Sequence, residues 1–140
     1  MASLRLASMR LGPAAMVLAA CTSSLGPQPA DPCTVEQDVV VMVSADPTPL
    51  FSWEPACGFA SLQVWDQNQT SGWVLYTGAR APDNPLRSGI RYGQAPPGAI
   101  EPAPATPLTK SINYTVAVYR WIGDEAGGSL FPAGSATFQR

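Results

Sequence analysis

The stretch "SINYTVAVYRWIG" (residues 111–123) carries the clearest structural signal in the chain. Large side chains that are mainly apolar recur in it at every second position: Ile112, Tyr114, Val116 and Val118. That period is typical of a β-strand with one face against a core. The turn-forming "DEAGG" (124–128) and a second extended stretch, "SLFPAGSATFQ" (129–139), follow directly. We therefore expect these segments to form the last hairpin of a β-sandwich.

Two further hairpins are predicted upstream. The β-branched and aromatic runs "VVVMVS" (39–44) and "LFSWE" (50–54) flank a turn with two prolines. The runs "FASLQVWD" (59–66) and "WVLYTG" (73–78) flank a polar turn. With fifteen prolines, twelve glycines and only 13% charged residues, the composition is also typical of an all-β protein with many turns. The sequence predicts one domain, residues 33–140, folded as an Ig-like antiparallel β-sandwich of about seven strands.

The segment 79–107 is harder to interpret. "SGIRYGQ" (88–94) fits a short strand, whereas "PPGAIEPAPATP" (96–107) has five prolines that a central strand would not accept. Pro102 and Pro104 have the same parity, so in a strand both missing N–H groups would lie on one side, as at the edge of a sheet. A polyproline-like loop is the alternative.

The domain resembles a fibronectin type III domain. The residues that carry this resemblance are Leu108, Tyr114 six positions later, Val116, Val118, Trp53 in an early strand, and "SLQVWD" opening the next. The resemblance implies that the Tyr114 hydroxyl bonds to the backbone near Leu108, forming a tyrosine corner. It also implies binding, spacing or adhesion rather than catalysis. The usual Pro-Gly before the tyrosine is Lys110-Ser111 here, and the turn "GDEAGG" has no Arg-Gly-Asp.

Two of the three cysteines are predicted to form a disulfide. The midpoint of Cys33 and Cys57 is residue 45, at the start of the turn between the first two strands. Folding the chain back at that turn brings the two residues opposite each other, near the ~5.5 Å Cα spacing of a disulfide. A free reactive thiol is the alternative, but the chain has no histidine to act as its base.

The third cysteine, Cys21, directly follows a predicted N-terminal export signal. Arg5 and Arg10 precede a short apolar run (11–20), which at about 1.5 Å per residue is too short to span a membrane. "LAAC" (Leu18–Cys21) resembles the lipobox of bacterial lipoproteins. The resemblance implies that residues 1–20 are a cleaved signal peptide and that Cys21 is acylated. An ordinary signal peptide with a chance cysteine is the alternative.

Residues 21–32 contain the lipidated Cys21 and a tether rich in Ser, Gly and Pro. The predicted partner is therefore a membrane, reached through the lipid on Cys21. Thr22 after the cysteine is typical of lipoproteins that transfer to the outer membrane in bacteria with two membranes. We expect a cell-envelope protein, facing the periplasm or the cell surface.

Charge and residue types exclude several classes of function. The formal net charge of −2 becomes −4 once Arg5 and Arg10 are removed with the signal peptide, so a nucleic-acid partner is not expected. The chain has no histidine, no Gly-x-Ser-x-Gly motif and no phosphate-binding glycine loop. Asp124-Glu125 is the only adjacent acidic pair and lacks the spacing of a calcium loop. We predict no enzyme activity, catalytic residue, metal site or cofactor.

The remaining candidate site is aromatic. If Val64 and Val116 point inward, then Trp65, Tyr119 and Trp121 point outward, and Trp73 or Tyr76 can join them on one face. We expect Trp65 and Tyr119 on adjacent strands, directly opposite or one diagonal step apart. We expect that these rings only stiffen the sheet, which gives the lipoprotein a structural or spacing role. The alternative is that the face is a binding module for a glycan or a protein.

Overall fold

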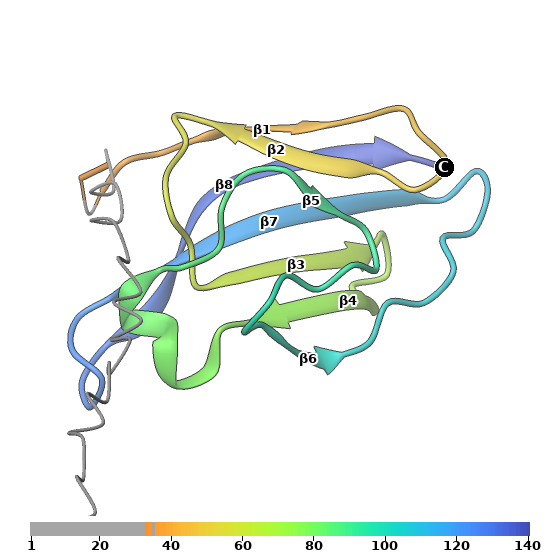
Figure 1. Ribbon diagram of the computed structural model, residues 1–140. Coiled ribbons are helices and arrows are strands. Elements are labelled where there is room, and N and C mark those ends of the chain that lie inside the picture. The colour runs from red at the N-terminus through yellow and green to blue at the C-terminus, as the bar shows by residue number, and fades with distance from the viewer. Residues whose placement is uncertain (1–32, 35) are drawn as a thin grey trace, which may run out of the picture.

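The protein is a β-sandwich of two antiparallel sheets, one of three strands and one of five. The computed structural model describes residues 33–34 and 36–140, and Figure 1 shows the two sheets as separate layers. The all-β, Ig-like prediction is confirmed, with eight strands among these residues instead of about seven. The predicted signal peptide (1–20) and the predicted tether (21–32), with Cys21, lie outside the described residues.

The smaller sheet has the order β1-β2-β5. Its strands are β1 (Val40–Val43), β2 (Leu50–Glu54) and β5 (Ile90–Arg91). The predicted pairing of the first two strands is confirmed: Val41 lies opposite Trp53, and both side chains are buried. In this register the hairpin is centred on residue 47 rather than on residue 45.

The larger sheet has the order β6-β4-β3-β7-β8. Its strands are β6 (Ile100–Ala103), β4 (Ser71–Tyr76), β3 (Ser61–Asp66), β7 (Asn113–Ile122) and β8 (Ser129–Gln139). Both hairpins predicted for this part of the chain are present. Of the two alternatives for the proline-rich segment, the edge strand is correct for residues 100–103, because β6 is the outermost strand and contains Pro102.

The core is filled by side chains from both sheets. Trp53, Phe51 and Phe59 are almost fully buried, as is Trp73 from the opposite sheet. The rings of Trp53 and Phe59 meet edge to face at 5.3 Å. The Trp53 indole N–H donates to the carbonyl of Cys57 at 2.8 Å, so this buried polar group is satisfied. Burial of each such side chain contributes about 1.5–3 kcal/mol to folding.

The Cys33–Cys57 disulfide joins the N-terminal entry of the domain to the connection between β2 and β3. The two Cα atoms are 5.4 Å apart, and Cys57 is fully buried. Figure 1 shows the first described segment, in orange, entering at the end of the sandwich opposite the C-terminus. The predicted bridge is therefore present, and it includes the first residue of the chain that the structure describes.

The tyrosine at the start of β7 makes the predicted corner contact. The Tyr114 hydroxyl accepts a hydrogen bond from the backbone N–H of Thr109 at 2.8 Å. Its ring stacks on Phe138 of β8 at 5.7 Å, and Leu108 packs against the core of which Tyr114 is a part. This contact fixes the path by which the chain enters β7.

Replacing both Cys33 and Cys57 by serine should lower the free energy of unfolding. The bridge spans a sequence separation of 24 residues. In the chain-entropy model a loop of this size is worth roughly 3.5 kcal/mol. Chemical denaturation of both proteins measures the difference, and mass spectrometry without reductant tests the bond directly. Two free thiols in the native protein would contradict the disulfide.

Tyr114→Phe should lower the free energy of unfolding by about 1 kcal/mol, because the N–H of Thr109 loses its acceptor. Tyr76→Phe is the matched control, since its hydroxyl makes no hydrogen bond within the described part of the chain. Thermal or denaturant melts of the two variants give the comparison. Equal stability of the two would mean that the corner contact contributes nothing.

Candidate functional site

The outer face of the five-stranded sheet carries two of the predicted aromatic residues. Leu62 and Val64 of β3 are fully buried, and so are Val116 and Val118 of β7. Because side chains alternate along a strand, Trp65 of β3 and Tyr119 of β7 point away from the core. Each ring is half-buried. The predicted direction of both side chains and the adjacency of their strands are confirmed.

The predicted spacing of the two rings is wrong. Trp65 lies opposite Thr115, and Tyr119 lies opposite Ser61, four residues away along β3. The rings are therefore neither direct nor diagonal cross-strand neighbours. The β3–β7 register follows from the buried valines and leucine, which the sequence alone does not align with one another.

Trp65 and Tyr119 nevertheless line the same hollows in the surface. One, of about 490 Å³, extends toward β8 and also has Ala117, Pro132 and Ser135 in its lining. The other, of about 230 Å³, is completed by two glutamine side chains, Gln63 and Gln69. We call these two hollows together the aromatic groove.

The middle of the aromatic groove is the cross-strand pair of Gln63 and Ala117. This pair lies between the rungs that hold Trp65 and Tyr119. Ala117 is only 3% exposed although it points to the outer face, so it forms a small apolar floor. The groove thus combines two aromatic walls, a floor without a bulky side chain and the amides of Gln63 and Gln69.

Partial burial raises the pKa of the Tyr119 hydroxyl above its ordinary value of 10.0. The phenol is therefore neutral at physiological pH and can donate a hydrogen bond. Burial also raises the pKa of Tyr92, whose hydroxyl lies 2.7 Å from the Thr106 carbonyl and 2.9 Å from the Gly72 carbonyl. Tyr92 is a core residue, whereas Tyr119 faces the groove.

Trp73 does not belong to the outer face. It is fully buried, packs on Tyr92 at 5.2 Å and donates its indole N–H to the Glu101 carboxylate at 2.6 Å. The reason is its register: Trp73 lies opposite Val64, which points into the core. The prediction that Trp73 is part of a binding face is therefore wrong.

Trp121 points outward but packs against its own hairpin turn. Its indole N–H donates to the carbonyl of Asp124 at 3.1 Å. A Cβ atom on Gly128 would come within 2.0 Å of that indole nitrogen, so only glycine leaves room for the ring. Trp121 is not among the residues that line the aromatic groove, and it stabilises the β7–β8 turn instead.

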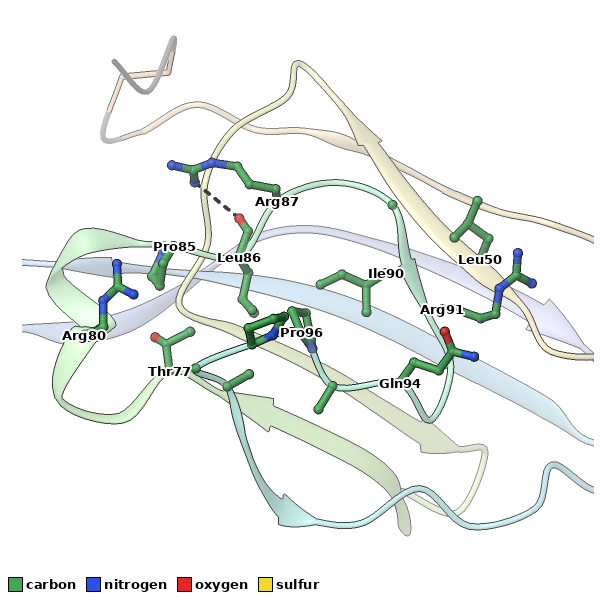
Figure 2. Close-up of a pocket in the computed structure, with 15 residues that line it drawn as sticks. Leu50, Thr77, Arg80, Pro85, Leu86, Arg87, Ile90, Arg91, Gln94 and Pro96 are labelled. Carbon is green, nitrogen blue, oxygen red and sulfur yellow. Dashed lines mark hydrogen bonds between the residues drawn. The ribbon is translucent and has the colours of Figure 1, made fainter. Parts of the chain in front are cut away.

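A larger cleft lies on another side of the domain, next to β5 and the 3₁₀ helix η1 (Gly78–Asp83) (Figure 2). Its volume is about 680 Å³. Three arginines are part of its lining: Arg80, Arg87 and Arg91. We call it the arginine cleft.

Asn84 holds the loop that carries this cleft. Its side-chain oxygen accepts from the backbone N–H of Trp121 at 2.7 Å, and its amide donates to the carbonyl of the same residue at 3.0 Å. Asn84 has φ 46°, in the left-handed region that asparagine tolerates better than most residues. Sequence reasoning did not identify the cleft, although three of the eight basic residues of the chain fall within residues 80–91.

The described residues show neither a metal-binding cluster nor a membrane-spanning helix. They contain no group of three or more His, Cys, Asp or Glu placed to hold a metal ion. No helix among them has the length and apolar character needed to cross a membrane. Comparison with known proteins finds no family model, no curated protein and no solved structure that matches this chain.

Substitution of Trp73 and of Trp65 should separate a core ring from a surface ring. Trp73→Ala should cost about 3–5 kcal/mol of stability, because it opens a cavity in the core. Trp65→Ala should cost about 1–2 kcal/mol, because its ring is only partly removed from water. Denaturant melts measure both values. A loss from Trp65→Ala as large as that from Trp73→Ala would assign Trp65 to the core.

Proposed function

We propose that this protein is a lipid-anchored lipoprotein of the bacterial cell envelope, and that its sandwich is a non-catalytic module that binds a glycan in the aromatic groove. The observation that carries the binding part is the placement of Trp65 and Tyr119 on either side of a low floor with two amide side chains within reach. The anchoring part rests on the sequence Leu18–Cys21 and on the segment that precedes it.

The chemistry of the groove suits a neutral sugar. The C–H groups of a sugar ring carry partial positive charge and pack well on the electron-rich face of an aromatic ring. The side chains of Gln63 and Gln69 each supply donors and an acceptor that match sugar hydroxyls. The neutral Tyr119 hydroxyl adds one more polar group. A few polar groups between apolar walls are the usual composition of a small-ligand site.

The proposed location follows from the N-terminal segment. The acyl groups on Cys21 would hold the chain at a membrane surface, and residues 22–32 would act as the tether. In a host with two membranes the outer membrane is the proposed site, facing the periplasm or the cell surface. Within the Ig-like class we propose a fibronectin type III-like domain, supported by the Tyr114 corner contact and by β1, β2 and β5 sharing a sheet.

A structural or spacing role is the second candidate. It is favoured by the half-burial of Trp65 and Tyr119 and by the packing of Trp121 on its own turn. In that role the rings would cover the outer face of the sheet without a ligand. The two candidates share the lipid anchor and differ only in whether the aromatic groove has an occupant.

Lipidation should depend on Cys21. Metabolic labelling with a fatty acid in a bacterial host should mark the natural chain and not the Cys21→Ser variant. Gel fluorography after membrane extraction measures the label. Labelling of equal intensity in the two proteins would disprove the anchor but would leave the glycan proposal standing.

Glycan binding should depend on Trp65 and Tyr119. On a glycan array, the purified full-length protein should bind at least one neutral oligosaccharide. Trp65→Ala and Tyr119→Ala should each weaken that binding by about ten-fold or more. Tyr76→Ala is the matched control, since Tyr76 is half-buried on neighbouring β4 but is not a lining residue of the groove. Binding that is equally strong in the groove variants would exclude this groove as the site.

A further inference from the structure

We propose that the arginine cleft is a second binding site, which takes an elongated small molecule with an apolar body and an anionic group at each end. The inference is independent of the aromatic groove, because the two sites share no lining residue. It rests on the charge of the cleft, on the position of two of its arginines and on the apolar side chains between them.

The charge of the cleft is opposite to that of the protein. The chain has a formal net charge of −2, yet three of its eight basic residues gather in the lining of this one hollow. No aspartate or glutamate is among the described residues that line it. A concave surface lined by one sign of charge concentrates ligands of the opposite sign. The ligand is therefore expected to be anionic.

Two of the three arginines are placed to bind it. Figure 2 shows Arg80 at one end of the cleft and Arg91 at the other. Their side chains are 59% and 38% exposed, so both are partly open to solvent. Arg87 has a structural task instead: it donates to the carbonyl of Asn84 at 2.7 Å and lies tightly against Gly58.

Each end arginine has an acidic partner that a ligand can replace. Arg80 is 3.5 Å from the Asp83 carboxylate, and Arg91 is 3.9 Å from that of Asp46. Both are exposed pairs of the kind that contribute about 0–1 kcal/mol. Arg91 also donates to the carbonyl of Thr48 at 2.9 Å, which holds its side chain in place. A ligand carboxylate or phosphate with bidentate geometry makes a stronger contact than either pair.

Apolar side chains lie between these ends, beside the polar groups of the lining. Leu86 and Ile90 are 3% and 4% exposed, and Pro96 closes the cleft from the turn that follows β5. The proline ring and the two aliphatic side chains suit a ligand whose middle part is a hydrocarbon chain and not a strongly hydrated group. The volume of about 680 Å³ lies within the range of small-molecule sites, roughly 300–1,000 Å³. Apolar side chains with a cation at either end define a ligand with two separated anionic groups.

The test uses isothermal titration calorimetry on the full-length protein in detergent. The probes are adipate, hexanoate and hexanediol, which share a six-carbon chain and differ in the number of anionic ends. Adipate should bind at least about ten-fold more tightly than hexanoate, and hexanediol should not bind measurably. Added salt should weaken adipate binding. Succinate and suberate find the best length, and hexanediol bisphosphate shows whether phosphate or carboxylate is preferred.

Variants assign the binding to the two end arginines. Arg80→Gln and Arg91→Gln should each reduce adipate affinity about ten-fold, to that of hexanoate. Lys110→Gln is the matched control, because it removes the same charge from outside the cleft and should change affinity less than two-fold. Asp83→Asn should strengthen binding about two- to five-fold, because it frees Arg80 from its partner. This last variant gives a gain that damage to the fold cannot mimic.

Several results would overturn the proposal. Equal affinity for adipate and hexanoate would remove the requirement for two anionic ends. Adipate binding that survives both Arg80→Gln and Arg91→Gln would place the ligand elsewhere. If Lys110→Gln lowered the affinity for adipate as much as the cleft variants do, the effect would come from the overall charge of the protein and not from the cleft. If no diacid and no bisphosphate bound, the proposed ligand class would also be excluded. None of these results bears on the aromatic groove.

Discussion

The structure depends on the pairing of β3 with β7 at the centre of the larger sheet. In this register Leu62 lies opposite Val118 and Val64 opposite Val116, and all four side chains are fully buried. A shift of one residue in this pairing would place the buried side chains of one strand beside the outward-facing side chains of the other. The register is therefore strongly specified. The same pairing places Trp65 and Tyr119 on the outer face and separates them by four positions along the strands, with the Gln63–Ala117 pair midway between them. The register of β3 and β7 therefore determines both the core and the aromatic groove.

How much of this could be predicted depended on how clearly each strand separates its two faces. In β7 the inward side chains are large and regular, so the direction of Tyr119 followed from period two. In β4 both faces carry large apolar residues, Trp73 and Leu75 on one and Val74 and Tyr76 on the other. Period two cannot choose between such faces, and the register irregularity beside Trp65 adds to the ambiguity. For this reason Trp73 was placed on the wrong side.

The disulfide was predictable for a different reason, because the turn between β1 and β2 brings Cys33 and Cys57 opposite each other, and in the proposed exported lipoprotein they are the one pair of cysteines left. The arginine cleft was not predictable. Its lining comes from several short segments, among them η1, the loop before β5 and the turn after it. The side chain of Asn84 brings part of this lining to β7 through two hydrogen bonds that span 37 positions in sequence. Contacts of this range between a loop and a distant strand leave no periodic pattern in the sequence.

If the domain is tethered through its N-terminal side, as proposed above, the position of the disulfide has a mechanical consequence. Cys33 precedes β1, and its partner Cys57 is fully buried between β2 and β3. Tension applied from the N-terminal side of Cys33 therefore divides at the bridge, and part of it reaches Cys57 directly. Cys57 lies in the core, where its carbonyl accepts a hydrogen bond from the Trp53 indole. Without the bridge, the same load would act on the four-residue strand β1 and would peel its hydrogen bonds from β2 one at a time. Because of this covalent link, the force reaches the core without first separating β1 from β2, and both sheets resist it together.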